Sequence, residues 1–396
     1  MPPATPQPPT GKPRGFGHAR APKLPVRIVH GEGAWVTDDA GNRYVDCAGG
    51  GALTFGHRHP RLVAAVRQQL DRVALTGQGY QDDRLDTFCS ELTGLLGTTA
   101  ALPMTTAVQA METAVRAAVA WGGATRGVPD WRANVVVEGA PPVRPVTPTV
   151  RPVRYGDADA VADAIDERTV AVLVEPVRGS AGVAVPPAGH LRRLRELCTE
   201  RGLLLVADET ESGLSRTGLT LAFDHERVTA DLTVLGGALG GGLVPLAAVT
   251  GDHDVLEAAG SGAGADGADG NPLACAVGGA VVGLLAAGTY QARARTLGER
   301  LREGLDRLVG RGLTAVRTRG LWAGMDVDPS CGDGRTVIEA LVTAGVLARQ
   351  AGERTLCLAP PLTISAGDLD WIVDELGALL EDLDSTPTVP LRSRRT

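Results

Sequence analysis

The sequence predicts an α/β fold built on a largely parallel sheet, accompanied by a smaller second domain. Two continuous apolar runs, TVAVLVEPV at 169–177 and GLLLVADE at 202–209, each end in acidic residues. A run without polar alternation is typical of a strand that is buried on both faces, as in a parallel sheet. Between the two runs, HLRRLRELCTERG at 190–202 has apolar residues at helical spacing, so the three segments predict a βαβ unit.

Other segments continue this alternation of strands and helices. DLTVLGG at 231–237 predicts a third buried strand, and 33–48 predicts two short strands joined by a turn at 38–42. After about residue 290, a helix, strand-like pieces and a last helix predict a smaller α+β domain. Helices are predicted from apolar spacing at 61–73, 108–122, 271–288, 294–310 and 368–383.

Composition and charge exclude several classes of function. The chain has 396 residues and a net charge of −7 without a basic cluster in its body, which argues against a nucleic-acid partner. No apolar run reaches the roughly 18 residues that a membrane span needs, and the Pro-rich start has no apolar signal region. Six scattered cysteines without a C-x-x-C pair indicate reduced thiols and no metal site. The sequence therefore predicts a cytoplasmic protein that binds neither nucleic acid nor a membrane.

Seven stretches, in the same order along the chain, resemble class III aminotransferases, and especially their diaminobutyrate–2-oxoglutarate branch. The resemblance covers roughly residues 27–383. It implies fold type I of the pyridoxal-phosphate enzymes, with a large, mostly parallel seven-stranded α/β domain and a small α+β domain from both chain ends. It also implies a dimer with its active sites at the subunit interface. The stretches are GAWVTDDAGNRYVDCAGGGALTFGHRHP, VEPVRGSAGV, LLLVADETESGLSRTG, VLGGALGGGLVPLAAV, GNPLACA, RGLWAGMDV and APPLTIS.

The resemblance also predicts the domain boundaries. Residues 26–70 and 291–384 are assigned to the small domain, and 71–290 to the large domain that carries the cofactor in this family. Residues 1–25 are rich in proline and are expected to be a disordered tail, and 385–396 a second tail.

Several site residues are assigned by the resemblance. Asp208, which ends a predicted strand, matches the carboxylate that contacts the pyridine nitrogen of pyridoxal phosphate, although it is also suited to capping the next turn. Ala107 and Val108 match the helix start that receives the phosphate. Glu175 matches a Glu-Pro motif at the substrate, and Arg216 an Arg-Thr-Gly turn. These last two residues are equally consistent with an inherited buried ion pair.

The Schiff-base lysine of the family has no counterpart. The family reads Leu-Gly-Lys-Ala-Leu-Gly-Gly-Gly where this chain has LGGALGGG at 235–242, so Gly237 takes the lysine position. The only two lysines, Lys12 and Lys23, lie in the N-terminal tail. Arginine is no substitute, because its guanidinium stays protonated and is not an available nucleophile.

Further positions depart from the family pattern. The aromatic segment that stacks on the cofactor ring is replaced by a Pro-rich connector at 141–157, and a phosphate-binding threonine falls at Gly267. Glu211 is expected to put negative charge near the ring's phenolate oxygen. The arginine that binds the substrate's α-carboxylate is Cys357, with Arg354 as a stand-in.

These losses predict weak or absent binding of pyridoxal phosphate and a non-transaminating partner or regulatory subunit. Such a subunit would form a homodimer, or a heterodimer with an active aminotransferase paralogue. One alternative is an enzyme that holds the cofactor without a lysine at Asp208 and uses His57 or Glu211 as its base. Another is an aminotransferase that works on an amino group with glutamate and 2-oxoglutarate. The resemblance also connects divergent chains of this kind with natural-product biosynthesis.

Overall fold

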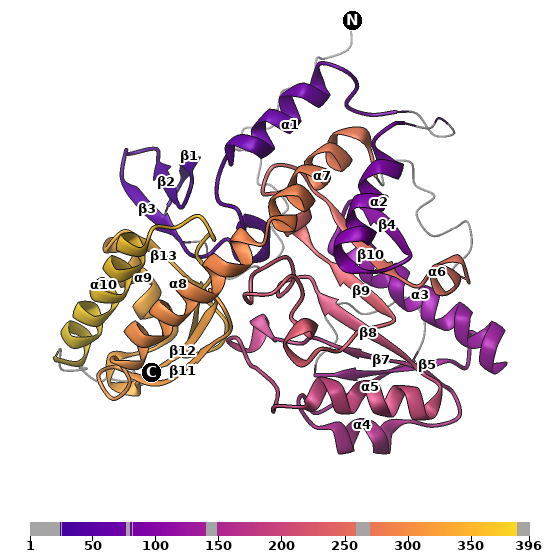
Figure 1. Ribbon diagram of the computed structural model, residues 1–396. Helices are drawn as coiled ribbons and strands as arrows, with labels where there is room; N and C mark the ends of the chain where they lie inside the picture. The colour runs from indigo at the N-terminus through magenta and orange to yellow at the C-terminus, as the bar shows by residue number, and fades with distance from the viewer. Residues whose placement is uncertain are drawn as a thin grey trace, which may run out of the picture.

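A seven-stranded sheet forms the centre of the larger part of the molecule. The computed structural model describes residues 24, 26–76, 80, 82–139, 149–258 and 270–385. The strand order is β4-β10-β9-β8-β7-β5-β6, and only β10 runs antiparallel to its neighbours. Helices cover both faces of this sheet (Figure 1). The predicted α/β class with a mostly parallel seven-stranded sheet is confirmed.

The elements described have the following bounds. The strands are β1 (Ile28–Glu32), β2 (Trp35–Asp38), β3 (Arg43–Asp46), β4 (Ala100–Met104), β5 (Asn134–Glu138), β6 (Thr149–Val153), β7 (Thr169–Val174), β8 (Leu204–Glu209), β9 (Leu232–Leu235), β10 (Ala247–Gly251), β11 (Leu313–Thr318), β12 (Ala323–Val327), β13 (Val346–Leu347), β14 (Arg349–Gln350) and β15 (Thr355–Leu358). The α-helices are α1 (Pro60–Leu70), α2 (Leu85–Leu96), α3 (Ala107–Arg126), α4 (Ala158–Ala164), α5 (His190–Arg201), α6 (His253–Ala258), α7 (Pro272–Ala286), α8 (Thr289–Asp306), α9 (Gly334–Thr343) and α10 (Ala366–Ser385). Two 3-10 turns matter for the site: η1 (Gly50–Leu53) and η4 (Gly237–Gly240).

The apolar strands are buried on both faces, as their sequences predict. From Ala171 to Val174, successive side chains of β7 alternate between two clusters, since Ala171 and Leu173 pack with α3 while Val172 and Val174 pack with α5. All six residues of β7 and all six of β8 are buried. These strands therefore fix the sheet inside a three-layer arrangement, which leaves the strand ends and the turns that follow them as the places for a site.

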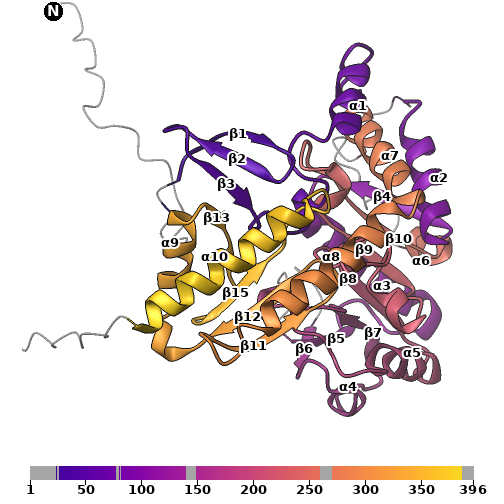
Figure 2. The ribbon, with the colours of Figure 1, turned by 60° about the vertical axis from the view of Figure 1, so that its left-hand side comes forward.

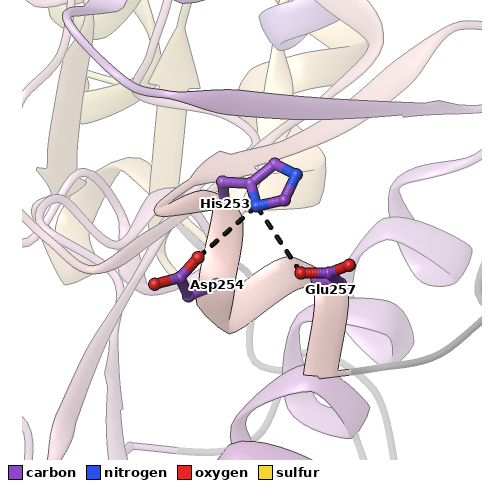
Figure 3. A group of neighbouring side chains, drawn as sticks. All are labelled: His253, Asp254 and Glu257. Atoms are coloured by element: carbon purple, nitrogen blue, oxygen red, sulfur yellow. Dashed lines mark ion pairs between the residues drawn. The ribbon is translucent and has the colours of Figure 1, made fainter.

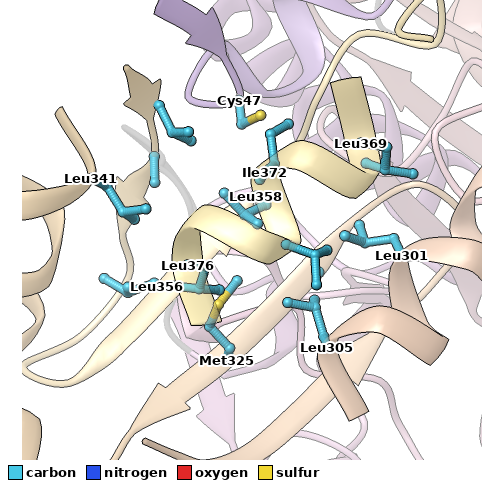
Figure 4. Packing of buried hydrophobic residues seen from close by; sticks show 14 of the residues in the cluster. Cys47, Leu301, Leu305, Met325, Leu341, Leu356, Leu358, Leu369, Ile372 and Leu376 are labelled. Atoms are coloured by element: carbon cyan, nitrogen blue, oxygen red, sulfur yellow. The ribbon is translucent and has the colours of Figure 1, made fainter. Parts of the chain in front are cut away.

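The smaller part of the molecule draws on both ends of the chain. Strand β13 pairs in parallel with β3, which joins the N-terminal strands to the C-terminal segment in one four-stranded sheet. A second four-stranded sheet has the order β11-β12-β15-β14. Cys47 from the N-terminal segment packs in the same cluster as Leu301, Met325 and Ile372 (Figure 4). The predicted domain boundaries stay predictions, and most of the two predicted tails lies outside the described residues.

Four turns meet at one edge of the large sheet. Strands β7, β8 and β9 are mutually parallel, and β4 shares their direction because both β4 and β9 are antiparallel to β10. The segments after these strands therefore all leave the sheet at the same edge. Figure 2 shows the smaller part and its long helices α8 and α10 beside this body.

Among the described residues, no single helix is long and apolar enough to cross a membrane. Helices α7 and α8 reach the length and apolar composition of a membrane span only when they are taken together, and the chain bends by 65° between them.

Candidate functional site

Asp208 places a buried carboxylate at the carboxyl end of β8. The residue is 4% exposed, and its Oδ1 accepts hydrogen bonds from the backbone N–H of Thr210 at 3.1 Å and from the Thr210 hydroxyl at 2.6 Å. Burial raises the pKa of Asp208, while the two bonds from Thr210 act in the opposite direction. No cationic side chain among the described residues pairs with this carboxylate within 4.0 Å. The site thus holds a desolvated acid that is not neutralised by a described cationic side chain.

Glu175, just after β7, brings a second acid to the same edge. Burial and, to a smaller extent, the charge of Asp208 raise its pKa while the charge of Arg178 lowers it, and the net result is a pKa of about 7. The Glu175 Oε1 and the Arg178 Nε are 3.8 Å apart, which is an ion pair without a hydrogen bond. Glu175 therefore changes its protonation state near neutral pH, as a proton-transferring group must.

Glu211 and Arg349 form the charged pair of the site. Arg349 Nη1 donates to Glu211 Oε1 at 2.9 Å, and Nη2 lies 3.4 Å from Oε2. A Cβ atom at Gly179 would collide with the Glu211 carboxylate and approach the Trp322 ring to 2.5 Å, so only glycine fits between them. Arg349 also lies opposite Cys357 in the β14–β15 ladder. The pair neutralises the charge that the sequence predicted to be unfavourable at Glu211.

Gly237 lies beside the Asp208 turn. It is exposed and begins η4, directly after β9. The preceding Gly236 packs so closely on the Thr210 carbonyl that a Cβ atom there would collide with it. At Gly237 itself, by contrast, a Cβ atom would meet nothing closer than the Ala52 Cβ at 3.4 Å, an ordinary contact. The backbone at this position is therefore next to Asp208 and has space for a side chain.

Helix α3 begins at the same edge, after β4. Its N-cap Thr106 accepts a hydrogen bond from the Gln109 N–H at 3.2 Å, and the Gln109 side chain accepts from the Thr106 N–H at 3.0 Å. This capping box leaves the N–H groups of Ala107 and Val108 without a hydrogen-bond partner among the described residues. The helix start can therefore still receive an anion.

Arg216 ties three segments of the chain together beneath the site. Its guanidinium is 1% exposed and donates from Nη1 to the Leu321 carbonyl at 3.0 Å and the Pro360 carbonyl at 2.6 Å. Nη2 lies 3.4 Å from the Thr54 hydroxyl oxygen. Burial lowers its pKa to about 10. The buried ion pair considered for Arg216 and Glu175 is not present, because Arg216 bonds to carbonyls and Glu175 pairs with Arg178.

Two other predicted residues lie elsewhere. Arg354 is exposed, between β14 and β15, and its charge acts on Asp328 and Asp333. His57 Nε2 is 2.9 Å from the Asp46 Oδ2 and its ring packs against Gly31, which is a structural contact. Neither residue contacts the acids of the site. Gly267 and residues 141–148 of the Pro-rich connector lie outside the described residues.

The sequence does not single out Arg349, for a physical reason. It precedes Cys357 by eight positions, so Arg354, only three positions away, was the more obvious substitute. The segment Ala351-Gly352-Glu353 is a turn signal, and a hairpin around it pairs Arg349 with Cys357 across the strands. Strand register, not distance along the chain, decides which guanidinium reaches the site.

A group of side chains with metal-binding chemistry lies on helix α6. His253 Nδ1 is 3.5 Å from the Asp254 Oδ1 and 3.8 Å from the Glu257 Oε2 (Figure 3). All three side chains are exposed. We interpret them as a surface ion-pair group, since water competes strongly for such contacts.

The chain is similar to known proteins over most of its length. The model of the aminotransferase class III family matches residues 16–138 and 152–380. The chain belongs to the class III aminotransferase family. The ornithine aminotransferase of Brevibacillus brevis is 35% identical over 385 residues, covering 92% of this chain and 96% of that protein. The ornithine aminotransferase of Bordetella pertussis is 37% identical, covering 90% and 92% of the two chains.

Solved structures agree with this membership. The ornithine aminotransferase from Toxoplasma gondii ME49 has a TM-score of 0.88 and 31% identity, with 93% of each chain covered. The acetylornithine aminotransferase from Elizabethkingia anophelis has a TM-score of 0.86 and 32% identity, covering 93% of this chain and 96% of that one. The predicted fold type I is confirmed, and pyridoxal phosphate is the cofactor of this family.

The prediction of a non-transaminating partner or regulatory subunit is wrong. It rested on changes at single positions, whereas the similarity to proteins named as aminotransferases extends over nine-tenths of the chain. The expectation of weak or absent cofactor binding has no support from these relatives. They carry the names of ornithine and acetylornithine aminotransferases and do not point specifically to the diaminobutyrate branch. The predictions about dimeric partners stay predictions.

The raised pKa of Glu175 makes a prediction about stability. An acid whose pKa rises from 4.5 to about 7 on folding destabilises the folded state as pH increases through that interval. Glu175→Gln removes this effect. The unfolding free energy of the variant minus that of the wild type should therefore be larger at pH 8 than at pH 4.5, by on the order of 3 kcal/mol. Urea unfolding at both pH values measures it, with exposed Glu299→Gln as the control. An unchanged difference at the two pH values would contradict the assignment.

Proposed function

We propose that this chain is a pyridoxal-phosphate-dependent enzyme that transfers an amino group from an amino acid to 2-oxoglutarate, with the cofactor held without a covalent bond to lysine. The observation that carries the proposal is the Arg349–Glu211 pair beside the buried acids Asp208 and Glu175. Family membership supports the reaction class, and the names of the relatives make ornithine the first donor to consider. Nothing in the proposal requires a side-chain amine at Gly237.

The described residues fit the cofactor in two respects. The unpaired, buried Asp208 carboxylate suits a protonated pyridine nitrogen, because a cation there offsets the cost of burying the acid. The start of α3 suits a phosphate, through the N–H groups of Ala107 and Val108. Gly237 follows β9, and β9 lies between β8 and β4 in the strand order, so Gly237 lies between these two positions. When bound, pyridoxal phosphate supplies an electron sink for the carbon that carries the substrate's amino group.

Arg349 is suited to bind the substrate's carboxylate. Its guanidinium offers two parallel N–H donors, which match the geometry of a carboxylate. In the described structure these donors bond to Glu211. When a substrate binds, Arg349 therefore exchanges the Glu211 carboxylate for the carboxylate of the substrate. When ornithine is the donor, the released Glu211 carboxylate is available to pair with the ammonium group of that substrate that does not react.

Glu175 is the group best suited to move a proton. A pKa of about 7 allows the Glu175 carboxyl to accept and to return a proton at neutral pH. Glu211 is less suited, because its carboxylate is already paired with Arg349. His57 is bonded to Asp46 and does not contact these acids.

The function is tested by an amino-transfer assay. We expect the full chain with added pyridoxal phosphate to convert 2-oxoglutarate to glutamate when ornithine is the donor, measured by chromatography of both amino acids. Arg349→Gln should raise KM for the donor about tenfold or more, because a charge-assisted hydrogen bond of about 1.5–3 kcal/mol is lost. Arg354→Gln is the matched control and should leave KM unchanged. No glutamate formation from ornithine or from a panel of other amino acids would contradict the proposal.

The space at Gly237 gives a second prediction. Gly237→Lys should fold with a thermal midpoint within a few degrees of the wild type, because the new Cβ atom meets only ordinary contacts. Treatment with pyridoxal phosphate and borohydride should then attach the cofactor to residue 237, detected by mass spectrometry of the digested protein. The wild type should show no attachment within residues 26–385, where it has no lysine. Failure to label the variant would contradict the placement of Gly237 beside the cofactor.

A further inference from the structure

A cavity of about 290 Å³ borders the turn that carries Glu175. Pro176 and Val177, which directly follow Glu175 in the chain, form part of its wall. None of the described residues assigned to the cofactor or to amino transfer lines it. Its volume is below the roughly 300 Å³ at which pockets for drug-sized ligands begin, so the cavity suits a small molecule. Most of its lining side chains are apolar, among them Val185 and Leu191.

Arg319 brings to this cavity a cation that no described acceptor satisfies. The residue belongs to the turn between β11 and β12 and is half-buried. Burial lowers the pKa of its guanidinium, while the charge of Glu226 acts in the opposite direction. Among the described residues, none accepts a hydrogen bond from this guanidinium, and no carboxylate lies within the 4.0 Å of an ion pair. The guanidinium has lost part of its hydration without gaining an acceptor, so an anionic ligand stabilises it.

His225, on the same cavity wall, lies within the field of Arg319. Its Nε2 is 3.0 Å from the Thr217 carbonyl oxygen, which can only accept, so Nε2 carries the proton and Nδ1 the lone pair. Burial and, less strongly, the charge of Arg319 lower the pKa of this ring to about 4, although the bond to Thr217 acts in the opposite direction. The His225 ring is therefore neutral at pH 7 and adds no charge to the cavity.

Glu226 supplies the only negative side chain in the described lining, and its carboxylate is already engaged. Oε1 accepts from the Gly189 N–H and Oε2 from the Arg192 N–H, both at 3.0 Å. The carboxylate thus caps the start of α5, and this helix end is not available to a ligand. Two arginines, Arg192 and Arg319, against one glutamate leave a net charge of +1 on the lining side chains. One further negative charge balances the cavity.

We propose that this cavity is a second ligand site, separate from the site of amino transfer, and that it binds a small aliphatic monocarboxylate. The planar fork of the Arg319 guanidinium matches the two oxygens of a carboxylate. Apolar side chains such as Val185 and Leu191 offer a wall to the aliphatic part of the ligand. A phosphate dianion fits less well, because its charge exceeds that of the cavity and meets the Glu226 carboxylate.

The test is a titration with 3-methylbutanoate at pH 7, followed by NMR of the full-length protein labelled in its histidine rings. The His225 signal, assigned with His225→Gln, should shift to saturation, because the bound carboxylate changes the field at the ring. Arg319→Gln should weaken binding about tenfold or more, since a charge-assisted hydrogen bond is lost. Arg193→Gln is the matched control and should bind as the wild type does, because exposed Arg193 lies in the same helix but lines the neighbouring cavity.

Two further comparisons test the class of ligand and the separation from amino transfer. 3-Methylbutanoate should bind about fivefold or more tightly than acetate, because it buries additional carbon atoms, and inorganic phosphate should bind more weakly than 3-methylbutanoate. Arg349→Gln should leave the affinity for 3-methylbutanoate unchanged. A loss of binding in Arg349→Gln would overturn the inference, because the carboxylate would then act through the site of amino transfer.

The remaining outcomes also decide the inference. An unmoved His225 signal, tighter binding of phosphate, or unchanged affinity in a folded Arg319→Gln variant would overturn it. An equal loss in Arg193→Gln would overturn it as well and would assign the ligand to the neighbouring cavity. If the wild type transfers no amino group but still binds 3-methylbutanoate through Arg319, the proposed function fails and the second site stands. Thermal melting of each variant establishes that the protein is folded.

Discussion

The buried guanidinium of Arg216 fixes the segments that surround the site relative to one another. It bonds to Leu321 and Pro360 of the smaller part and approaches Thr54 of the N-terminal segment, while its own backbone belongs to the turn after β8. A cation buried without a carboxylate is costly unless its donors are bonded. Here backbone carbonyls accept from Nη1, while Nε has no hydrogen-bond partner among the described residues. These carbonyls are 105 and 144 positions away from Arg216 in the sequence, so one side chain joins segments that are far apart along the chain.

The turn that presents Arg216 is itself strained. Leu214 and Ser215 have φ values of 55° and 76°, a region that non-glycine residues seldom adopt. Such a backbone persists only when its surroundings over-determine it, and the bonds of Arg216 do so. Gly320 allows the close approach on the other side, since a Cβ atom there would lie 2.6 Å from the Arg216 carbonyl oxygen. The site is thereby assembled from both parts of the molecule before any ligand binds.

The site itself is an arrangement of compensated charges. Asp208, Glu175 and Glu211 bring three acids to one sheet edge, where burial and, less strongly, mutual repulsion raise the pKa of the first two. Arg349 compensates Glu211 directly, and Arg178 compensates Glu175 in part. Asp208 remains without a cation among the described residues. That remaining imbalance is what a protonated pyridine ring would correct, so the charge distribution favours a bound cofactor even without a lysine.

The sequence predicted most of the fold and part of the site. The apolar runs at β7 and β8 and the acids at their ends follow from local pattern, because burial on both faces and strand-end position are local properties. The position of Arg349 in the site could not be predicted from local pattern, because it depends on the pairing of β14 with β15. Judging function from single lost residues failed for a related reason: the sequence shows the changes at Gly237 and Cys357 directly but does not show which distant side chains lie beside them.

The most direct test of a non-covalently held cofactor is a titration of the full chain with pyridoxal phosphate, followed by visible circular dichroism. The wild type should develop an induced signal that dialysis removes and that borohydride does not fix to residues 26–385. Asp208→Asn should weaken the binding about tenfold or more, because the charged partner of the ring nitrogen is lost. A wild type without any induced signal, or an Asp208→Asn variant that binds as tightly as the wild type, would contradict the account.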